Sequence, residues 1–307
     1  TRYWVEEGRA SGLIVDLDPS PLYLQHIASL VDLNLLRSFG HRVMVDAMFG
    51  AGLGYLPTLL SGGKTTVKEL HGNRNPAFPG MEQPEPITQN LKELMARVPQ
   101  EQASVGIALD GDADRVGIVD ERGNFITTLN VFNLLAFYFM EEKQLRGPIV
   151  KGVTSSMMLN AMEDRYGIKV HEEKVGFKNI GPKMQEEKAL MAGEESGGFA
   201  FKGHIPERDG ILSGLYLLEY MSVAKASPAQ LLGNLFNIMG PHHYHRRDIK
   251  FEPNERERIQ SLVDNPDLSQ VGEFQVVESD STDGRRLKFA KGWLAVRFSG
   301  TEPLLRI

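Results

Sequence analysis

Apolar positions in the first 120 residues alternate between helical spacing and short continuous runs. Pro21–Phe39 carries apolar residues at the spacing of one helix face, and Gly40 is placed to end that helix. The runs Arg42–Asp46 and Val105–Leu109 predict buried strands, and Ile87–Val98 predicts the helix between them. This order indicates a βαβ unit with a parallel or mixed sheet. The pattern also predicts a glycine turn at Gly50–Gly54 that leads into Tyr55–Leu60, a long loop at Asn73–Pro86 and a strand at Val116–Val119.

A second unit with the same alternation follows, and the pattern changes after it. The predicted helices are Val131–Glu142, Ser155–Tyr166 and Asp209–Ala224, and the predicted strands are Pro148–Lys151, Lys169–Glu172 and Ala189–Ala192. Asp209 is placed as an N-cap, and Ser227-Pro228 begins another helix. After Gly240-Pro241 come a basic strand at Tyr244–Phe251, a polar helix at Asn254–Asp264 and short strands. We therefore expect an α/β protein: two similar α/β domains with mixed sheets, followed by a smaller α+β C-terminal domain.

Composition narrows the class of protein. The chain has 307 residues, of which 41% are hydrophobic and 24% charged, as in an ordinary globular protein of two or three domains. The net charge of −6 argues against a nucleic-acid partner. The apolar stretch Val131–Met140 is too short to cross a bilayer, so we expect no membrane partner. The absence of Cys excludes disulfides and cysteine nucleophiles and suits a cytoplasmic location.

The strongest chemical signal is the acidic segment Asp110–Arg115, directly after a predicted strand. Asp110, Asp112 and Asp114 alternate with small residues, so they repel one another unless a hard cation such as Mg²⁺ or Ca²⁺ neutralises them. A calcium loop of the helix–loop–helix type needs Gly at its sixth position, where this chain has Arg115. A phosphatase with Asp110 as the nucleophile and a solvated acidic turn remain as alternatives.

Two further loops carry groups suited to a phosphorylated sugar. Gly193–Gly198 sets Glu194 and Ser196 among glycines, where they can hydrogen-bond sugar hydroxyls; the alternative is an ordinary acidic turn. Arg297–Pro303 offers the donors of Arg297, Ser299 and Thr301 and the amides around Gly300, which suit a phosphate dianion; the alternative is a hairpin loop. The run His242–His245 has no carboxylate partner at zinc spacing, so we expect a linker and the start of a strand there.

Together, these three loops resemble the α-D-phosphohexomutase family, and the resemblance extends from about Leu13 to Ile307. The segments Val45–Gly52 and Pro84–Pro86 also fit the second domain of such enzymes. The amino-acid sequences of the sugar and phosphate loops are more similar to those of glucomutases than to those of phosphomannomutases or glucosamine mutases. The resemblance implies a magnesium loop at Asp110, Asp112 and Asp114, a sugar loop with Glu194 and Ser196, and a phosphate loop with Arg297, Ser299, Gly300 and Thr301.

The resemblance also exposes a departure from the family. No segment matches the phosphoserine loop of the family's first domain. The resemblance therefore implies a linker from a missing first domain at 1–17, a second domain at 18–122, a third at 123–238 and an incomplete fourth at 239–307. We expect this chain alone to be inactive as a mutase.

The implied activity is interconversion of hexose 1-phosphate and hexose 6-phosphate through a bisphosphorylated sugar, with Mg²⁺ and glucose 1,6-bisphosphate as cofactors. Arg115 would assist phosphoryl transfer, Lys178 would act as acid–base or phosphate contact, and Lys151 would contact substrate. The hexose and the oligomeric state stay open, as do phosphomannomutase and phosphoglucosamine mutase activity. A non-catalytic module that binds Mg²⁺ and a sugar phosphate is the alternative from another functional class.

Overall fold

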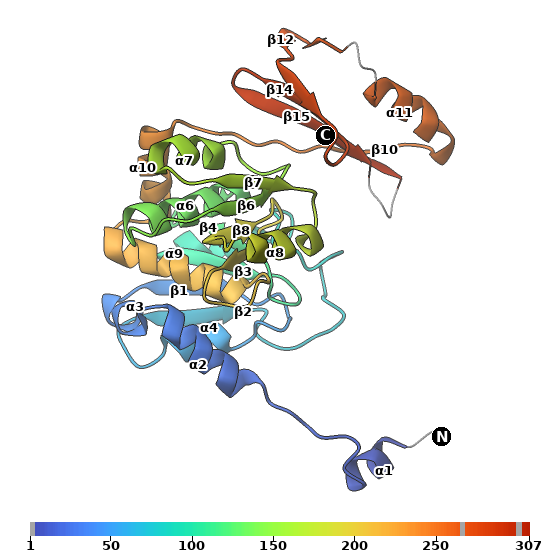
Figure 1. Cartoon of the computed structure of the whole chain (residues 1–307). Helices are drawn as coiled ribbons and strands as arrows, with labels where there is room; N and C mark the ends of the chain where they lie inside the picture. The colour runs from blue at the N-terminus through green and yellow to red at the C-terminus, as the bar shows by residue number, and fades with distance from the viewer. Residues whose placement is uncertain (1–3, 265–267, 299–302) are drawn as a thin grey trace.

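The computed structural model describes residues 4–264, 268–298 and 303–307. A short helix, α1 (Val5–Ala10), stands away from the body of the molecule, and three folded units follow it along the chain (Figure 1). Within the described residues, no helix combines the length and the apolar character needed to span a membrane.

The first unit is built on a five-stranded mixed sheet with the strand order β2-β1-β3-β4-β5. Its strands are β1 (Arg42–Asp46), β2 (Thr66–Leu70), β3 (Val105–Leu109), β4 (Val116–Val119) and β5 (Phe125–Ile126), and its helices are α2 (Ser20–Leu30), α3 (Leu33–Phe39), α4 (Tyr55–Leu60) and α5 (Lys92–Gln100). The central strand β1 runs parallel to β2 and β3, whereas β4 is antiparallel to β3. The predicted strands are confirmed, and β2 is an edge strand that the apolar pattern did not reveal.

The helix predicted over residues 21–39 is wrong as a single element. Val31 is extended, with φ −126° and ψ 155°, and separates α2 from α3. Asp32 then accepts a hydrogen bond from the Leu35 amide and begins α3 as its N-cap. The continuous apolar spacing concealed this break because both helices bury the same side of the chain. The helix predicted over residues 87–98 also begins later than expected, at Lys92. The residues before it form a turn, in which the side-chain amide of Asn90 donates to the carbonyls of Gln83 and Glu85.

The second unit repeats the core topology of the first with the strand order β7-β6-β8-β9. Its elements are α6 (Thr128–Glu141), β6 (Ile149–Gly152), α7 (Met158–Tyr166), β7 (Val170–Glu173), α8 (Phe177–Glu186), β8 (Met191–Gly193), β9 (Phe199–Phe201), α9 (Gly210–Ala224) and α10 (Pro228–Met239). β6 is parallel to β7 and β8, and β9 is antiparallel to β8. The N-cap predicted at Asp209 is confirmed by its bond to the Leu212 amide. The helix predicted to begin at Ser227-Pro228 is also confirmed, and Ser227 is its N-cap, with a bond to the Gln230 amide. Helix α8 was not predicted.

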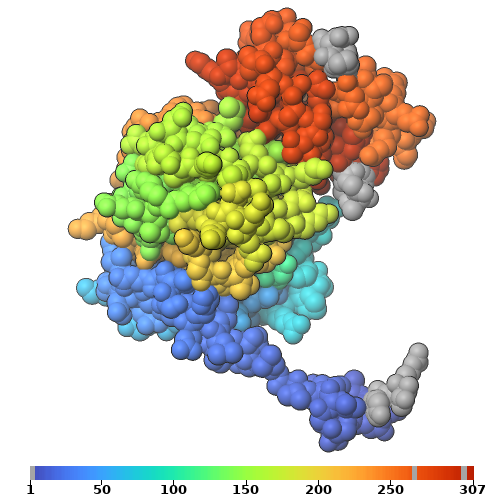
Figure 2. Space-filling view, in the orientation of Figure 1, coloured from blue at the N-terminus to red at the C-terminus, as the bar shows by residue number. Residues whose placement is uncertain are grey.

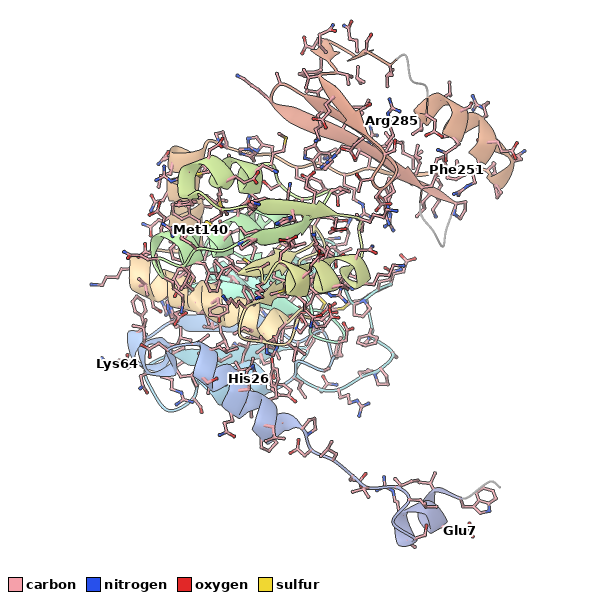
Figure 3. The ribbon with its side chains drawn as sticks, viewed as in Figure 1. Glu7, His26, Lys64, Met140, Phe251 and Arg285 are labelled. Carbon is pink, nitrogen blue, oxygen red and sulfur yellow. The ribbon has the colours of Figure 1, made fainter. Side chains whose placement is uncertain are left out.

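One apolar core joins the two α/β units. α9 lies between their sheets, with contacts to β3 and β4 on one side and to β9 and α6 on the other (Figure 1). α6 is buried along most of its length, as the all-apolar run predicted, and Met140 lies fully buried inside the second unit (Figure 3). The two units therefore share helices instead of meeting only at polar surfaces, which fixes the loops at their boundary.

The C-terminal unit is an antiparallel sheet with the order β10-β16-β15-β14-β13, and it sits against the second unit (Figure 2). Its elements are β10 (Asp248–Lys250), a 3₁₀ turn (Pro253–Glu255), α11 (Arg256–Val263), β11 (Gln270–Val271), β12 (Phe274–Gln275), β13 (Glu278–Asp280), β14 (Arg285–Phe289), β15 (Gly292–Phe298) and β16 (Leu304–Arg306). The strand predicted over Tyr244–Phe251 is confirmed only at Asp248–Lys250; its predicted start is wrong, because residues 240–247 form an irregular connection that includes the histidine run. The predicted fold class, two α/β units and a smaller α+β unit, is confirmed.

Candidate active site

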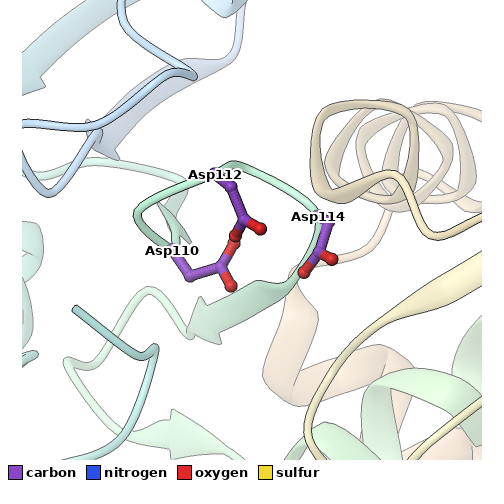
Figure 4. A group of neighbouring side chains, drawn as sticks. All are labelled: Asp110, Asp112 and Asp114. Atoms are coloured by element: carbon purple, nitrogen blue, oxygen red, sulfur yellow. The ribbon is translucent and has the colours of Figure 1, made fainter. Parts of the chain in front are cut away.

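The three alternating aspartates form a hairpin loop between β3 and the antiparallel β4; we call residues 110–115 the acidic loop. Carboxylate oxygens of Asp110, Asp112 and Asp114 all lie within 4.8 Å of one another and face one space (Figure 4). Two neighbouring loops hold the backbone: the Ala51 amide donates to the Gly111 carbonyl at 2.9 Å, and the Gly111 amide donates to Pro84 at 3.1 Å. A preformed cluster of hard oxygen ligands results.

The electrostatics of the acidic loop favour a bound divalent cation. Burial raises the pKa of Asp110, which is fully enclosed. Burial, together with the charge of Asp110, raises the pKa of Asp114 to about 7. Both shifts arise because several carboxylates share one poorly solvated space with too little positive charge. Three carboxylate donors fit Mg²⁺ or Ca²⁺, and an ion would remove the repulsion that raises these pKa values.

Arg115 closes the acidic loop. Its Nε lies 2.5 Å from Asp110 Oδ2, its amide donates to Asp110 Oδ1 at 2.9 Å, and Nη1 donates to Glu85 at 2.9 Å. The guanidinium is therefore fixed at the edge of the aspartate cluster, as the sequence led us to expect.

The glutamate-containing loop occupies the same topological position in the second unit, between β8 and the antiparallel β9; we call residues 194–198 the glutamate loop. Glu194 is buried and accepts a 2.8 Å hydrogen bond from the Gly176 amide, while Ser196 is half-buried in the same turn. Burial raises the pKa of Glu194. Gly197 adopts φ 97°, a left-handed conformation that favours glycine.

The acidic loop and the glutamate loop meet backbone to backbone. The Val116 amide donates to the Gly197 carbonyl at 3.0 Å, and Arg115 forms a β-bridge with Gly198. The two loops lie far apart in the sequence and belong to different units, yet they form one continuous surface across the boundary of the units; we call this surface the ligand wall.

Arg208 is a site residue that the sequence analysis missed. Its Nη2 lies 2.5 Å from Asp114 Oδ2, and its Nη1 lies 3.6 Å from Glu194 Oε2. The only local signal was its position directly before the helix cap Asp209, which places it at the turn between β9 and α9.

The two predicted lysines have different surroundings. Lys178 is exposed in the first turn of α8, close to Gly176, whose amide binds Glu194. Lys151 is fully buried within the second unit, where its Nζ lies 3.0 Å from Glu172 Oε1 and donates to the Ser156 carbonyl at 3.1 Å. Burial lowers the pKa of Lys151. The structure thus places Lys178 beside the site and encloses Lys151 behind it.

The predicted phosphate loop is described only in part. Ser299, Gly300 and Thr301 lie outside the described residues. Arg297 is on β15, where Nε lies 3.1 Å from Asp283 Oδ2, and Asp283 also accepts from the Val175 amide at 3.0 Å. A small cavity between the second and C-terminal units is lined by, among others, Thr154, Glu195, Arg246, Arg297 and Arg306. All three arginines are paired with aspartates, Arg297 with Asp283 and the other two with Asp248.

Family models match three successive parts of the chain. The phosphoglucomutase/phosphomannomutase alpha/beta/alpha domain II matches residues 21–123, domain III matches residues 130–239, and the C-terminal domain matches residues 258–307. The acidic loop lies in the first match and the glutamate loop in the second.

Individual relatives agree with these matches. The phosphoglucomutase/phosphomannomutase of Thermococcus kodakarensis is 31% identical over 93% of this chain and 60% of its own length. The phosphoglucosamine/phosphogalactosamine mutase of Sulfurisphaera tokodaii is 29% identical over 93% of this chain and 61% of its own. A crystal structure of a Thermus thermophilus protein assigned as a phosphomannomutase aligns with a TM-score of 0.80 and 29% identity, over 98% of this chain and 67% of that one.

The chain spans about three fifths of the length of these two curated relatives. Three family models in the family's order, a shared fold and two motif loops that meet in space all lead to one assignment. The chain belongs to the α-D-phosphohexomutase family, that of the phosphoglucomutases and phosphomannomutases.

Proposed function

We propose that this chain supplies the metal, sugar and phosphate loops of an enzyme that interconverts hexose 1-phosphate and hexose 6-phosphate. The observation that carries the proposal is the backbone contact between the acidic loop and the glutamate loop, through the bridge of Arg115 with Gly198 and the adjacent bond from Val116 to Gly197. A sugar held at Glu194 would lie beside the cation ligands. The phosphoryl carrier, a phosphoserine, would come from a segment that no part of these 307 residues matches.

Each loop has a distinct task in this proposal. Asp110, Asp112 and Asp114 would hold Mg²⁺, which supplies charge neutralisation for a phosphoryl group in transit. Arg115 is fixed where it can bind an oxygen of that group. Glu194 and Ser196 would orient the sugar by its hydroxyls, and Arg297 would hold the phosphate that does not react.

The substrate we propose is a glucose phosphate, with mannose and glucosamine phosphates as alternatives. Relatives carry names from each of these groups, so sequence likeness alone does not separate them. Lys178 is proposed as an acid–base group or phosphate contact because it is exposed beside the glutamate loop. A solved structure of Aspergillus fumigatus N-acetylphosphoglucosamine mutase that shares this fold holds magnesium and GlcNAc-6P, and another holds glucose 1,6-bisphosphate. These complexes support Mg²⁺ and a bisphosphorylated sugar as the ligands to test.

A calorimetric titration with MgCl₂ tests the metal loop. We expect one site in the wild-type protein and at least about tenfold weaker binding in Asp112→Ala, because one of three charges around a divalent ion is lost. Asp164→Ala is the matched control, since Asp164 is exposed on α7 away from the acidic loop. Equal affinities in wild type and Asp112→Ala would refute the metal assignment.

A turnover assay separates the mutase from its rivals. Conversion of glucose 1-phosphate to glucose 6-phosphate, read through a coupled dehydrogenase, should be absent with the chain alone, even with Mg²⁺ and glucose 1,6-bisphosphate. A fusion that places the serine-loop domain of the Thermococcus kodakarensis relative ahead of this chain should gain turnover that Asp112→Ala abolishes. A fusion that binds the bisphosphate without turnover would favour the non-catalytic module. Sustained turnover by the chain alone would make Asp110 the first candidate for the phosphoryl carrier.

A further inference from the structure

One guanidinium lies between the acidic loop and the glutamate loop. Arg208 places Nη2 on Asp114 and Nη1 near Glu194, and its Cζ lies 5.5 Å from the centre of the Phe177 ring. Within residues 4–264, 268–298 and 303–307, it is the only cation with ion pairs to both loops. The two terminal nitrogens of a planar fork thus serve a proposed metal ligand and a proposed sugar ligand at once.

The backbone directly after Arg208 is held by two hydrogen bonds. The Asp209 amide donates to Phe199 on β9 at 3.0 Å, and the Gly210 amide donates to the Ala113 carbonyl of the acidic loop, also at 3.0 Å. The stem of Arg208 occupies space that Gly198 leaves free, because a Cβ at Gly198 would lie 2.2 Å from Arg208 Cδ. The guanidinium is therefore placed by packing against Gly198 and by backbone bonds to β9 and to the acidic loop.

The position of the Arg208 guanidinium affects cation binding at Asp114. The guanidinium supplies Asp114 with part of the positive charge that a divalent cation would supply, so cation and guanidinium compete for the same carboxylate. A guanidinium released from Asp114 still has Glu194 as a partner and has donors free for an oxyanion.

We propose that Arg208 is a positioning residue that couples cation binding at the acidic loop to phosphosugar binding at the glutamate loop. This inference rests on the proposed function, because it takes Asp114 and Glu194 as ligands of the two loops. A cation on Asp114 frees the guanidinium for a phosphosugar oxyanion. By linkage, a phosphosugar that holds the guanidinium away from Asp114 raises the affinity for the cation by the same factor.

The first measurement is MgCl₂ titration of the wild type, Arg208→Gln and Arg122→Gln. We expect Arg208→Gln to bind Mg²⁺ about three- to tenfold more tightly, because a competing positive charge is removed. Arg122→Gln loses the same charge from an exposed turn at the opposite end of β4 and should stay within about twofold of wild type.

The second measurement is the affinity for glucose 6-phosphate with and without Mg²⁺. The ratio of the two affinities should exceed one in wild type and fall at least about threefold in both Arg208→Gln and Arg208→Lys, because an ammonium cannot pair with both loops as a fork does. An unchanged ratio in folded Arg208→Lys, or unchanged Mg²⁺ affinity in Arg208→Gln with a wild-type melting temperature, overturns the coupling. Wild-type protein that fails to bind Mg²⁺ refutes the proposed function instead.

Discussion

Both α/β units bury a charged side chain near the end of the central strand, of opposite sign and one register position apart. Asp46 ends the central strand β1 of the first unit, and Lys151 lies near the end of the central strand β6 of the second. Both side chains are fully buried. Asp46 Oδ1 lies 2.8 Å from His71 Nδ1, just beyond β2, whereas Lys151 pairs with Glu172 on β7. In both units the partner therefore comes from the same side of the central strand, from β7 or from the residue directly after β2.

The difference between the two pairs lies in what they connect. The Asp46 pair stays within the first unit, and Asp46 also accepts from the Met48 amide, at the start of the loop that supports the acidic loop. The Lys151 pair extends outward, because Arg286 of β14 donates to Glu172, to Asp280 and to the Val153 carbonyl. One buried charge organises a ligand loop, and the other joins the second unit to the C-terminal unit.

Removing one partner from each pair should give the largest contrast. Glu172→Gln leaves Lys151 and Arg286 without their shared carboxylate and should lower the free energy of unfolding by about 3 kcal/mol. Asp46→Asn keeps an acceptor for His71 and Met48 and should cost about 1 kcal/mol. Urea denaturation followed through Trp293 fluorescence and circular dichroism measures both. Equal losses in the two variants would break the comparison.

The two carboxylates should also give stability opposite slopes in acid. Burial alone would raise the pKa of Glu172, but the bonds from Arg286 and Lys151 outweigh it and lower the pKa from 4.5 to about 2. Stability from Glu172 is therefore complete above pH 4.5 and is lost as the pH falls towards 2. Burial raises the pKa of Asp46, so its contribution declines as the pH rises above 3.8.

Unfolding curves between about pH 3 and 7 measure these slopes. Over this range Glu172→Gln should remove up to about 2 kcal/mol of acid-dependent loss, and Asp46→Asn should remove a smaller opposing trend. Profiles of the two variants that superimpose on that of wild type would contradict both assignments.

Glycines beside the two ligand loops should differ in their tolerance of a methyl group. A Cβ at Gly50 would lie 2.4 Å from the Gly111 carbonyl oxygen, so Gly50→Ala must shift the acidic loop. The three atoms nearest to a Cβ at Gly198 all belong to the Arg208 side chain, so Gly198→Ala would displace that side chain and not the loop backbone. We expect Gly50→Ala to weaken Mg²⁺ binding about tenfold and Gly198→Ala to strengthen it about twofold, because the competing guanidinium is displaced, by calorimetry. The reverse order would show that side-chain placement matters more than the loop backbone.

The two lysines should give the smallest and most selective contrast. Lys178→Met should leave the free energy of unfolding within about 0.5 kcal/mol of wild type, because the side chain is exposed. It should weaken glucose 6-phosphate binding a few-fold through the lost charge. Lys151→Met should change stability without a specific loss of sugar-phosphate affinity in the folded fraction. If the affinity for glucose 6-phosphate depended on Lys151 and not on Lys178, Lys151 would be the sugar-phosphate contact and Lys178 would not.

Features with a local signature could be predicted from the sequence. The two ligand loops, the caps at Asp209 and Ser227 and the alternation of strands and helices each depend on neighbouring residues. The break at Val31 and edge strand β2 were missed because tertiary contacts, not periodicity, decide them.

The partners of Lys151 and Arg208 could not be predicted either. Sheet register brings Glu172 to Lys151, and Arg286 reaches the pair from a distant part of the chain. Arg208 reaches Asp114 only because α9 packs between two sheets. Such contacts depend on the assembled fold, and no short motif encodes them.

The bond from the Val116 amide to Gly197 has a practical consequence for dynamics. This amide, at the start of β4 directly after the acidic loop, bonds to the glutamate loop, so it exchanges its hydrogen with solvent only when the two units separate locally. Its exchange rate therefore reports the opening of the whole ligand wall from a single atom. A slow rate in ligand-free protein would mean that the spacing between the cation ligands and Glu194 is set during folding, before any sugar arrives.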